Sequence, residues 1–172
     1  MLSQNKIGFK QNYNELCKQQ NPKIMKKLLL LSFLFVVLQA KAQWSYGSHT
    51  NSMTDKTESY AVVKSLNKVN FSFPYEGGST FKLIIFNNYQ IQLIASKGQF
   101  LYGGYLLLKF DDSKPRTFGY SLPSDGSADK VIFVVGHRII KEMRNHTILR
   151  IEAPFYQEGR KIIEFNISNY KY

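Results

Sequence analysis

The sequence has a single cysteine, Cys17, and no apolar run as long as a membrane-spanning helix. A helix that crosses a bilayer needs about 20 apolar residues, whereas the longest run, residues 28–38, has 11 including Ser32. We therefore expect no transmembrane anchor in the mature chain. Because Cys17 precedes the export signal described below, the exported chain would hold no cysteine. That excludes a disulfide scaffold, a zinc–thiolate site, a cysteine nucleophile and a lipid-modified cysteine.

Sequence motifs of common enzymes and metal sites are also missing. The chain contains no Gly-x-Ser-x-Gly motif and no Asp-x-Asp-x-Asp-Gly spacing, and its three histidines are not spaced as metal ligands. Asp111, Asp112 and Asp125 fall among turn-forming residues, so we interpret them as turn residues rather than calcium ligands. We expect no metal, no cofactor and no catalytic residue.

Residues 25–42 have the three parts of a secretory signal peptide. Met25-Lys26-Lys27 is basic, residues 28–38 are apolar, and residues 40–42 form an Ala-x-Ala cleavage pattern. We expect signal peptidase to cut near Ala42-Gln43. The mature protein would then be periplasmic or secreted.

The segments on either side of this signal differ in composition. Residues 1–24 are polar without an apolar period, and we interpret them as a mis-assigned upstream extension or a disordered segment, with translation starting at Met25. A long leader is the alternative. Residues 43–172 have the length of one domain. This part keeps 16 of the 23 basic and 11 of the 12 acidic residues, a net charge of about +5. We expect no nucleic-acid partner, while an anionic glycan or phospholipid surface stays open.

Most of the mature chain consists of short segments with β-strand patterns. Residues 69–73 alternate, which places Val69, Phe71 and Phe73 on one face. Asn87-Asn88 separates two apolar segments and predicts a hairpin. The predicted strands are residues 60–65, 69–73, 81–86, 89–94, 105–110, 116–122, 131–135, 147–153 and 161–167.

One segment, residues 137–145, has a helical pattern with Ile139, Ile140 and Met143 on one side and Asn145 as a C-cap. The polar residues 43–59 are expected to contain no strand, and residues 131–135 are expected to be buried on both faces. Many short strands predict a mainly β domain, either an antiparallel β-sandwich or a partly open barrel, with one short helix late in the chain.

Several aromatic residues fall in predicted loops or at strand ends. Aromatic rings bind sugars, and Tyr and Trp are enriched at interfaces. The alternative is that they fill the core, which we favour for Trp44 and leave open for Phe155 and Tyr156. The loop aromatics are Trp44, Tyr46, Tyr75, Phe100, Tyr102, Tyr105, Phe155 and Tyr156, of which Trp44, Tyr102, Tyr105, Phe155 and Tyr156 are the tentative binding residues.

A series of short landmarks resembles a known group of proteins. They are Trp44, Met53-Thr54-Asp55, Gly98-Gln99-Phe100, residues 110–115, residues 124–127, Ile139-Ile140 and a final Glu-Phe strand near Tyr170. In this order the chain resembles small exported bacterial domains of unknown function and, more distantly, type VI secretion accessory proteins of the TagO/VasI type. Those accessory proteins tend to carry Arg and Cys where this chain has Phe86-Asn87. The resemblance carries over no catalytic residue.

We expect a non-enzymatic exported envelope protein that binds a protein partner or a surface polymer such as a glycan. A first alternative is a hydrolase of envelope glycan, and a second is a structural subunit of a secretion-related assembly, which a large exposed apolar patch would favour. The hydrolase would use a carboxylate pair among Asp55, Asp111, Asp112, Asp125 and Glu152.

Overall fold

A computed structural model describes residues 44–50 and 52–171. The predicted upstream segment, residues 1–24, and the predicted signal peptide, residues 25–42, lie outside the described residues. Within the described part of the chain, no helix is long and apolar enough to cross a membrane.

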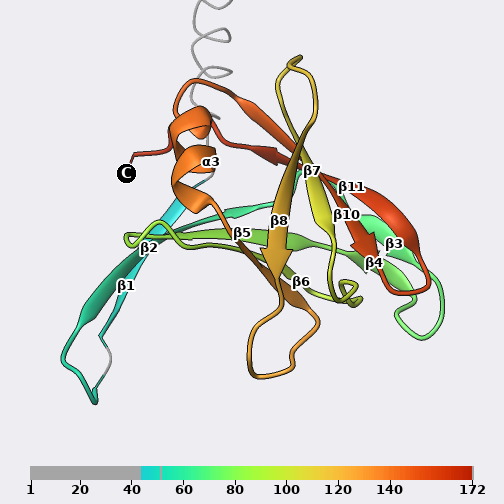
Figure 1. Ribbon diagram of the computed structural model, residues 1–172, viewed down its shortest axis with the longest axis horizontal. Helices are drawn as coiled ribbons and strands as arrows, with labels where there is room; N and C mark the ends of the chain where they lie inside the picture. The colour runs from blue at the N-terminus through green and yellow to red at the C-terminus, as the bar shows by residue number, and fades with distance from the viewer. Residues whose placement is uncertain (1–43, 51, 172) are drawn as a thin grey trace, which may run out of the picture. The chain divides into compact units, whose positions relative to one another are not determined.

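The described chain is mainly β, as predicted, with one nine-stranded antiparallel sheet that is not closed into a barrel (Figure 1). The strand order is β1-β2-β5-β6-β9-β8-β7-β10-β11, and β3 and β4 form a separate small sheet. The strands are β1 (Trp44–Thr50), β2 (Thr57–Lys64), β3 (Val69–Phe71), β4 (Gly77–Ser79), β5 (Phe81–Phe86), β6 (Ile91–Ala95), β7 (Tyr105–Phe110), β8 (Arg116–Ser121), β9 (Lys130–Phe133), β10 (Ile148–Phe155) and β11 (Gly159–Asn166).

Alternating side chains place one face of the long sheet in the core. In β5, for example, Phe81, Leu83 and Ile85 are buried while the residues between them are exposed or half-buried. The same alternation in the other central strands gives a single hydrophobic cluster, and burial of this apolar surface drives folding. The largest fully buried side chains are Phe81, Phe110, Phe155, Phe165, Leu83, Ile85, Ile91, Leu93, Leu106, Leu108, Ile139 and Met143.

Side chains from the loop after β2 cover part of the β11 edge. The Asn67 amide nitrogen donates to the Ile162 carbonyl at 2.9 Å, and the Asn67 side-chain oxygen accepts from the Glu164 amide at 2.8 Å. The Leu66 amide also donates to the Glu164 carbonyl, at 2.7 Å. These bonds satisfy backbone groups that an edge strand would otherwise leave open to other chains.

The predicted helix is present as α3 (Gly136–Met143), with Ile139, Ile140 and Met143 buried. It starts one residue earlier than predicted and ends at Met143, so that Arg144 rather than Asn145 occupies the C-cap. Gly136 lies against the β5–β6 turn: a Cβ atom there would be 1.9 Å from the Tyr89 carbonyl oxygen. Only glycine fits this contact without a backbone shift.

The predicted β5–β6 hairpin is confirmed, although its turn differs from the expected one. The positive φ falls on Tyr89, at 66°, and not on either asparagine. Asn88 contributes through its side chain, whose oxygen accepts from the Gln90 amide at 3.0 Å. This local bond makes the tight turn without requiring a positive φ at asparagine.

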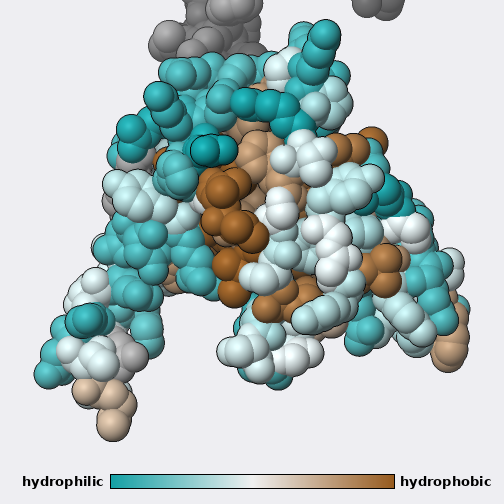
Figure 2. Space-filling model, viewed as in Figure 1, coloured by the Kyte–Doolittle hydropathy of each residue, from teal (hydrophilic) through white to brown (hydrophobic). Residues whose placement is uncertain are grey.

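Three other expectations about the strands are wrong. The polar residues 43–59 contain β1, which pairs with β2 in a hairpin that projects from the rest of the sheet (Figure 1). Phe73 is 79 % exposed because β3 ends at Phe71. Val134 is 67 % exposed because β9 ends at Phe133 and buries only one of its faces. Figure 2 shows a band of hydrophobic residues at the surface between the positions of α3 and β8 in Figure 1, within a largely hydrophilic rim.

Candidate functional site

Four connections meet at one end of the sheet, and we call residues 72–76, 96–105, 122–129 and 156–158 the loop end. Backbone hydrogen bonds join three of them: the Leu101 amide donates to Pro154 at 3.1 Å, the Tyr156 amide to Gln99 at 2.8 Å, and the Phe100 amide to Ala128 at 2.7 Å. These bonds hold loops that are far apart in sequence in one arrangement.

Two side chains add further anchors to the loop end. The Tyr120 hydroxyl, inside the sheet, donates to the Leu101 carbonyl at 2.6 Å, and burial raises the pKa of this phenol. The Glu158 carboxylate accepts from the Ser72 amide and pairs with Lys161 at 3.1 Å. The hydrogen bond from the Ser72 amide has the largest effect on the pKa of Glu158 and lowers it, and the hydrogen bond from Lys161 lowers it further. The β3–β4 connection is thereby tied to the β10–β11 turn.

Three of the five predicted binding residues are exposed at this end. Tyr102 is 88 % exposed, Tyr105 47 % and Tyr156 51 %. The Arg160 guanidinium lies 4.6 Å from the Tyr105 ring centroid and pairs with Glu152, so it positions this ring. The structure therefore exposes three tyrosine side chains on two linked loops.

The other two predicted binding residues, Trp44 and Phe155, belong to the core. Phe155 is 1 % exposed, and its ring centroid lies 4.6 Å from that of Phe100 and 5.0 Å from that of Phe71. Strand β10 runs two residues further than predicted, which turns Phe155 inward. Trp44 is 5 % exposed and donates from its indole nitrogen to the Ser168 carbonyl at 3.1 Å. Neither ring is available to a ligand at the surface.

A hollow of about 490 Å³ opens at the loop end beside Tyr75. Gly98, with a φ of 91°, allows a close approach there, because a Cβ atom would lie 2.7 Å from the Phe71 ring. The hollow presents an amide, a carboxylate, an ammonium group and hydroxyls around the half-buried Tyr75 ring. This combination suits a polar ligand with a flat apolar face. Besides Tyr75 and small residues, the lining consists of Ser96, Lys97, Gln99, Ser127 and Asp129.

Sequence reasoning noted Tyr75 as a loop aromatic but did not identify this polar hollow. Its lining comes from three connections separated by more than 20 residues each. The fold brings them together: the Phe100 amide donates to the Ala128 carbonyl, and the Lys97 ammonium group donates to the Glu76 carbonyl at 2.9 Å. The glycines at 98 and 126, both with positive φ, were the available local signal. They indicate sharp turns but do not say which turns meet.

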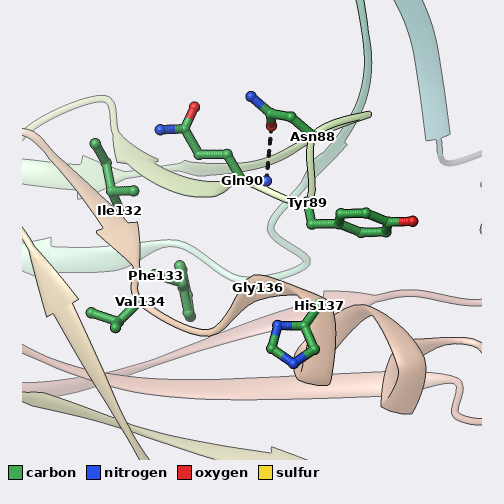
Figure 3. Close-up of a pocket in the computed structure, with 8 residues that line it drawn as sticks. All are labelled: Asn88, Tyr89, Gln90, Ile132, Phe133, Val134, Gly136 and His137. Atoms are coloured by element: carbon green, nitrogen blue, oxygen red, sulfur yellow. Dashed lines mark hydrogen bonds between the residues drawn. The ribbon is translucent and has the colours of Figure 1, made fainter.

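A second hollow, of about 580 Å³, lies between the β5–β6 turn, β9 and the start of α3 (Figure 3). Asn88 and Gln90 lie on one rim in this view and His137 on the opposite one. The exposed Tyr89 and Val134 flank it. This is a wide depression with scattered polar groups and no converging set of acids and bases among its lining residues.

Three of the five acids proposed for a hydrolase, Asp111, Asp125 and Glu152, have hydrogen-bond or ion-pair partners in the structure. Asp111, in the β7–β8 turn, accepts from the Ile148 amide at 2.8 Å, from the His146 imidazole at 2.9 Å and from the Thr147 hydroxyl at 2.9 Å. These three partners, of which the Ile148 amide has the largest effect, hold the pKa of Asp111 well below its ordinary value. The other imidazole nitrogen of His146 faces Glu142, at 3.6 Å, rather than a hydroxyl nucleophile.

The remaining predicted acids lie in other parts of the fold. Asp125 accepts from the Ser127 hydroxyl and amide and pairs with Lys130 at 3.0 Å, and these partners lower its pKa. Glu152 pairs with Arg160, Asp112 is exposed beside Asp111, and Asp55 lies in the β1–β2 connection. A general acid needs a raised pKa, which is the opposite of the shifts at Asp111 and Asp125. Among the described residues, no group of three or more His, Cys, Asp or Glu side chains could hold a metal ion.

Comparisons with protein-family models, with curated proteins and with solved structures find no significant match to this chain. The resemblance to type VI secretion accessory proteins therefore stays a prediction from the sequence motifs alone.

Proposed function

We propose that this is a non-enzymatic, exported binding protein of the bacterial envelope, and that its loop end binds a surface glycan. The observation that carries the proposal is that Tyr102, Tyr105 and Tyr156 are exposed on loops that are hydrogen-bonded to one another and to the loops lining the polar hollow. Export rests on the signal-peptide pattern of residues 25–42.

The chemistry of the loop end favours a glycan over an apolar ligand. A sugar offers hydroxyls to planar and charged side chains such as Gln99, Asp129 and Lys97, and a flat C–H face to an aromatic ring such as Tyr75. Extended polymers bind through several weak contacts in a row. Tyr102 and Tyr156, on loops linked to the hollow, would supply such further contacts.

The bonding of the acids supports a role without catalysis. Asp111, Asp125 and Glu152 each have a separate set of partners, and those of Asp111 and Asp125 stabilise the ionised form. A glycosidase needs one carboxyl that stays protonated near neutral pH. We therefore assign these acids to turns and strand pairs rather than to a reaction.

The proposal is tested with tagged mature protein, residues 43–172, on a glycan array and in a pull-down from envelopes followed by mass spectrometry. We expect glycan binding that is lost when Tyr102→Ala and Tyr156→Ala are combined. Tyr89→Ala is the matched control, because Tyr89 is 60 % exposed but lies in the β5–β6 turn, at the end of that hairpin away from the loop end.

Other results would overturn the proposal. A stoichiometric protein partner that depends on the same two tyrosines would replace the glycan with a protein ligand. Release of sugar fragments by the wild type would restore the hydrolase alternative. Glycan binding that is unchanged in the double variant would remove the loop end as the site.

A further inference from the structure

Three lysines lie in one row across the outer face of four neighbouring strands. In β2, β5, β6 and β9 the buried residues alternate with outward ones, so Lys64, Lys82, Ile94 and Lys130 all point away from the core. Strand register aligns Lys64 with Lys82, Lys82 with Ile94, and Ile94 with Lys130. The row therefore runs straight across the sheet.

The positive charge of this row is largely uncompensated. Lys130 pairs with Asp125 at 3.0 Å, whereas Lys64 and Lys82 are exposed and directly opposite one another. Among the outward residues of these four strands, Glu58 is the one acidic residue; it lies at the far end of β2 from Lys64, opposite His49 of β1. Like charges directly opposite on paired strands destabilise a sheet, so the Lys64–Lys82 pair costs stability in the free protein.

The adjacent rows of the same face are apolar. Val62, Ile84 and Ile132 are half-buried and share the next row with Gln92. Beyond them lie Tyr60 and Phe86, whose ring centroids are 6.2 Å apart. We call the outward residues Tyr60, Val62, Lys64, Lys82, Ile84, Phe86, Gln92, Ile94, Lys130 and Ile132 the lysine face.

We propose that the lysine face binds the surface of a phospholipid bilayer that contains anionic lipids. Lysines next to apolar side chains on one face match a surface that offers phosphate groups beside apolar glycerol and acyl segments. A soluble polyanion would use Lys64 and Lys82 but would leave the apolar rows without a role. The net charge of about +5 on residues 43–172 adds long-range attraction to the same surface.

This site is independent of the proposed glycan-binding function, because it uses strand residues rather than Tyr102 and Tyr156. The contacts are expected to be shallow, since the apolar side chains of the lysine face are half-buried in the sheet. Binding should therefore be reversible and sensitive to salt, as electrostatic contacts at a surface are.

The test is co-sedimentation of mature protein, residues 43–172, with vesicles of phosphatidylcholine alone and of phosphatidylcholine mixed equally with phosphatidylglycerol. These residues are suitable because the described chain belongs to one compact unit, Ala42–Tyr172. We expect binding to the mixed vesicles only, and release on raising the salt concentration. Equal binding to both kinds of vesicle, or to neither, would overturn the proposal.

A matched pair of variants separates this face from net charge. Lys64→Gln combined with Lys82→Gln should lower the partition coefficient about 25-fold, since each lysine near an anionic surface contributes roughly a factor of five. Lys114→Gln combined with Lys141→Gln removes the same charge from exposed positions in the β7–β8 turn and α3. This control should bind nearly as well as the wild type.

Two outcomes of the variant experiment would contradict the proposal. Equal losses in the two double variants would mean that net charge, not this face, causes binding. Retention on immobilised dextran sulfate without vesicle binding would mean that the row recognises a soluble polyanion. Thermal unfolding of each variant checks that the sheet is intact, and neutral glutamine at both positions removes repulsion rather than adding it.

Discussion

The loop end and the lysine face occupy different parts of one sheet and are positioned by different interactions. At the loop end, Tyr102 and Tyr156 lie on connections that are held by bonds between loops and by Tyr120 beneath them. On the lysine face, Lys64 and Lys82 are fixed by strand register alone. Loops can present groups at many angles, whereas a strand face presents side chains in regularly spaced rows. The first arrangement therefore suits a ligand of defined shape, and the second an extended surface.

The largest effect is expected from Phe155→Ala, which removes the ring that supports the loop end. Phe155 packs among Phe71, Phe81 and Phe100 and is 1 % exposed. Loss of a buried phenylalanine costs about 3–5 kcal/mol, to be measured by denaturant unfolding. Its neighbour Tyr156 is half exposed, and Tyr156→Ala should change the free energy of unfolding by less than about 0.5 kcal/mol. Similar losses in both variants would contradict the assignment of Phe155 to the core.

A smaller loss is expected from Gly136→Ala at the start of α3, which follows the end of β9 opposite to Lys130. The added Cβ atom would lie 1.9 Å from the Tyr89 carbonyl oxygen, so α3 and the β5–β6 turn must separate. Overpacking of this kind costs about 1–3 kcal/mol. Gly119→Ala is the control, because its Cβ would meet only a Val134 methyl group at 3.6 Å. Thermal unfolding of both variants checks the prediction, and equal midpoints would refute it.

Asp111→Asn tests a turn that belongs to neither surface. The bonds from Ile148, His146 and Thr147 lower the pKa of Asp111 in the folded state. The stability that they provide is present above the ordinary aspartate pKa, about 3.9, and is lost as the pH falls from there towards the lower folded pKa. We expect the wild type to lose stability below about pH 4 more steeply than Asp111→Asn. Parallel curves would show that Asp111 does not contribute to acid unfolding.

Local patterns in the sequence were enough to predict most of the strands. The β5–β6 hairpin is visible because two apolar segments flank a pair of asparagines. Strand β1 was missed because, among its residues, only Trp44 is buried, and a polar projecting hairpin has no apolar alternation to detect. Val134 was wrongly predicted to be buried because it belongs to a run of five apolar residues, and such a run does not reveal where β9 ends.

The two surfaces depend on contacts between distant segments. Tyr102 and Tyr156 could be predicted as loop aromatics, but Phe155 could not be separated from Tyr156 without knowing that β10 continues through Pro154. The lysine row requires β9 to pair with β6 although β7 and β8 lie between them in sequence. No local pattern around Lys130 indicates that pairing.

The smallest expected effect distinguishes a lysine pair kept for binding from one kept for stability. Lys82→Glu replaces a repulsive pair with Lys64 by an attractive one and should raise the free energy of unfolding by about 0.2–1 kcal/mol. The same change should weaken binding to anionic vesicles, because it reverses one charge of the row. Urea unfolding and vesicle co-sedimentation measure the two effects on one preparation. A gain in stability together with a loss of binding is the result that a purely structural role for Lys82 cannot produce. A loss of stability would contradict the prediction, because it would mean that packing of the lysine aliphatic chain on the sheet outweighs the charge repulsion.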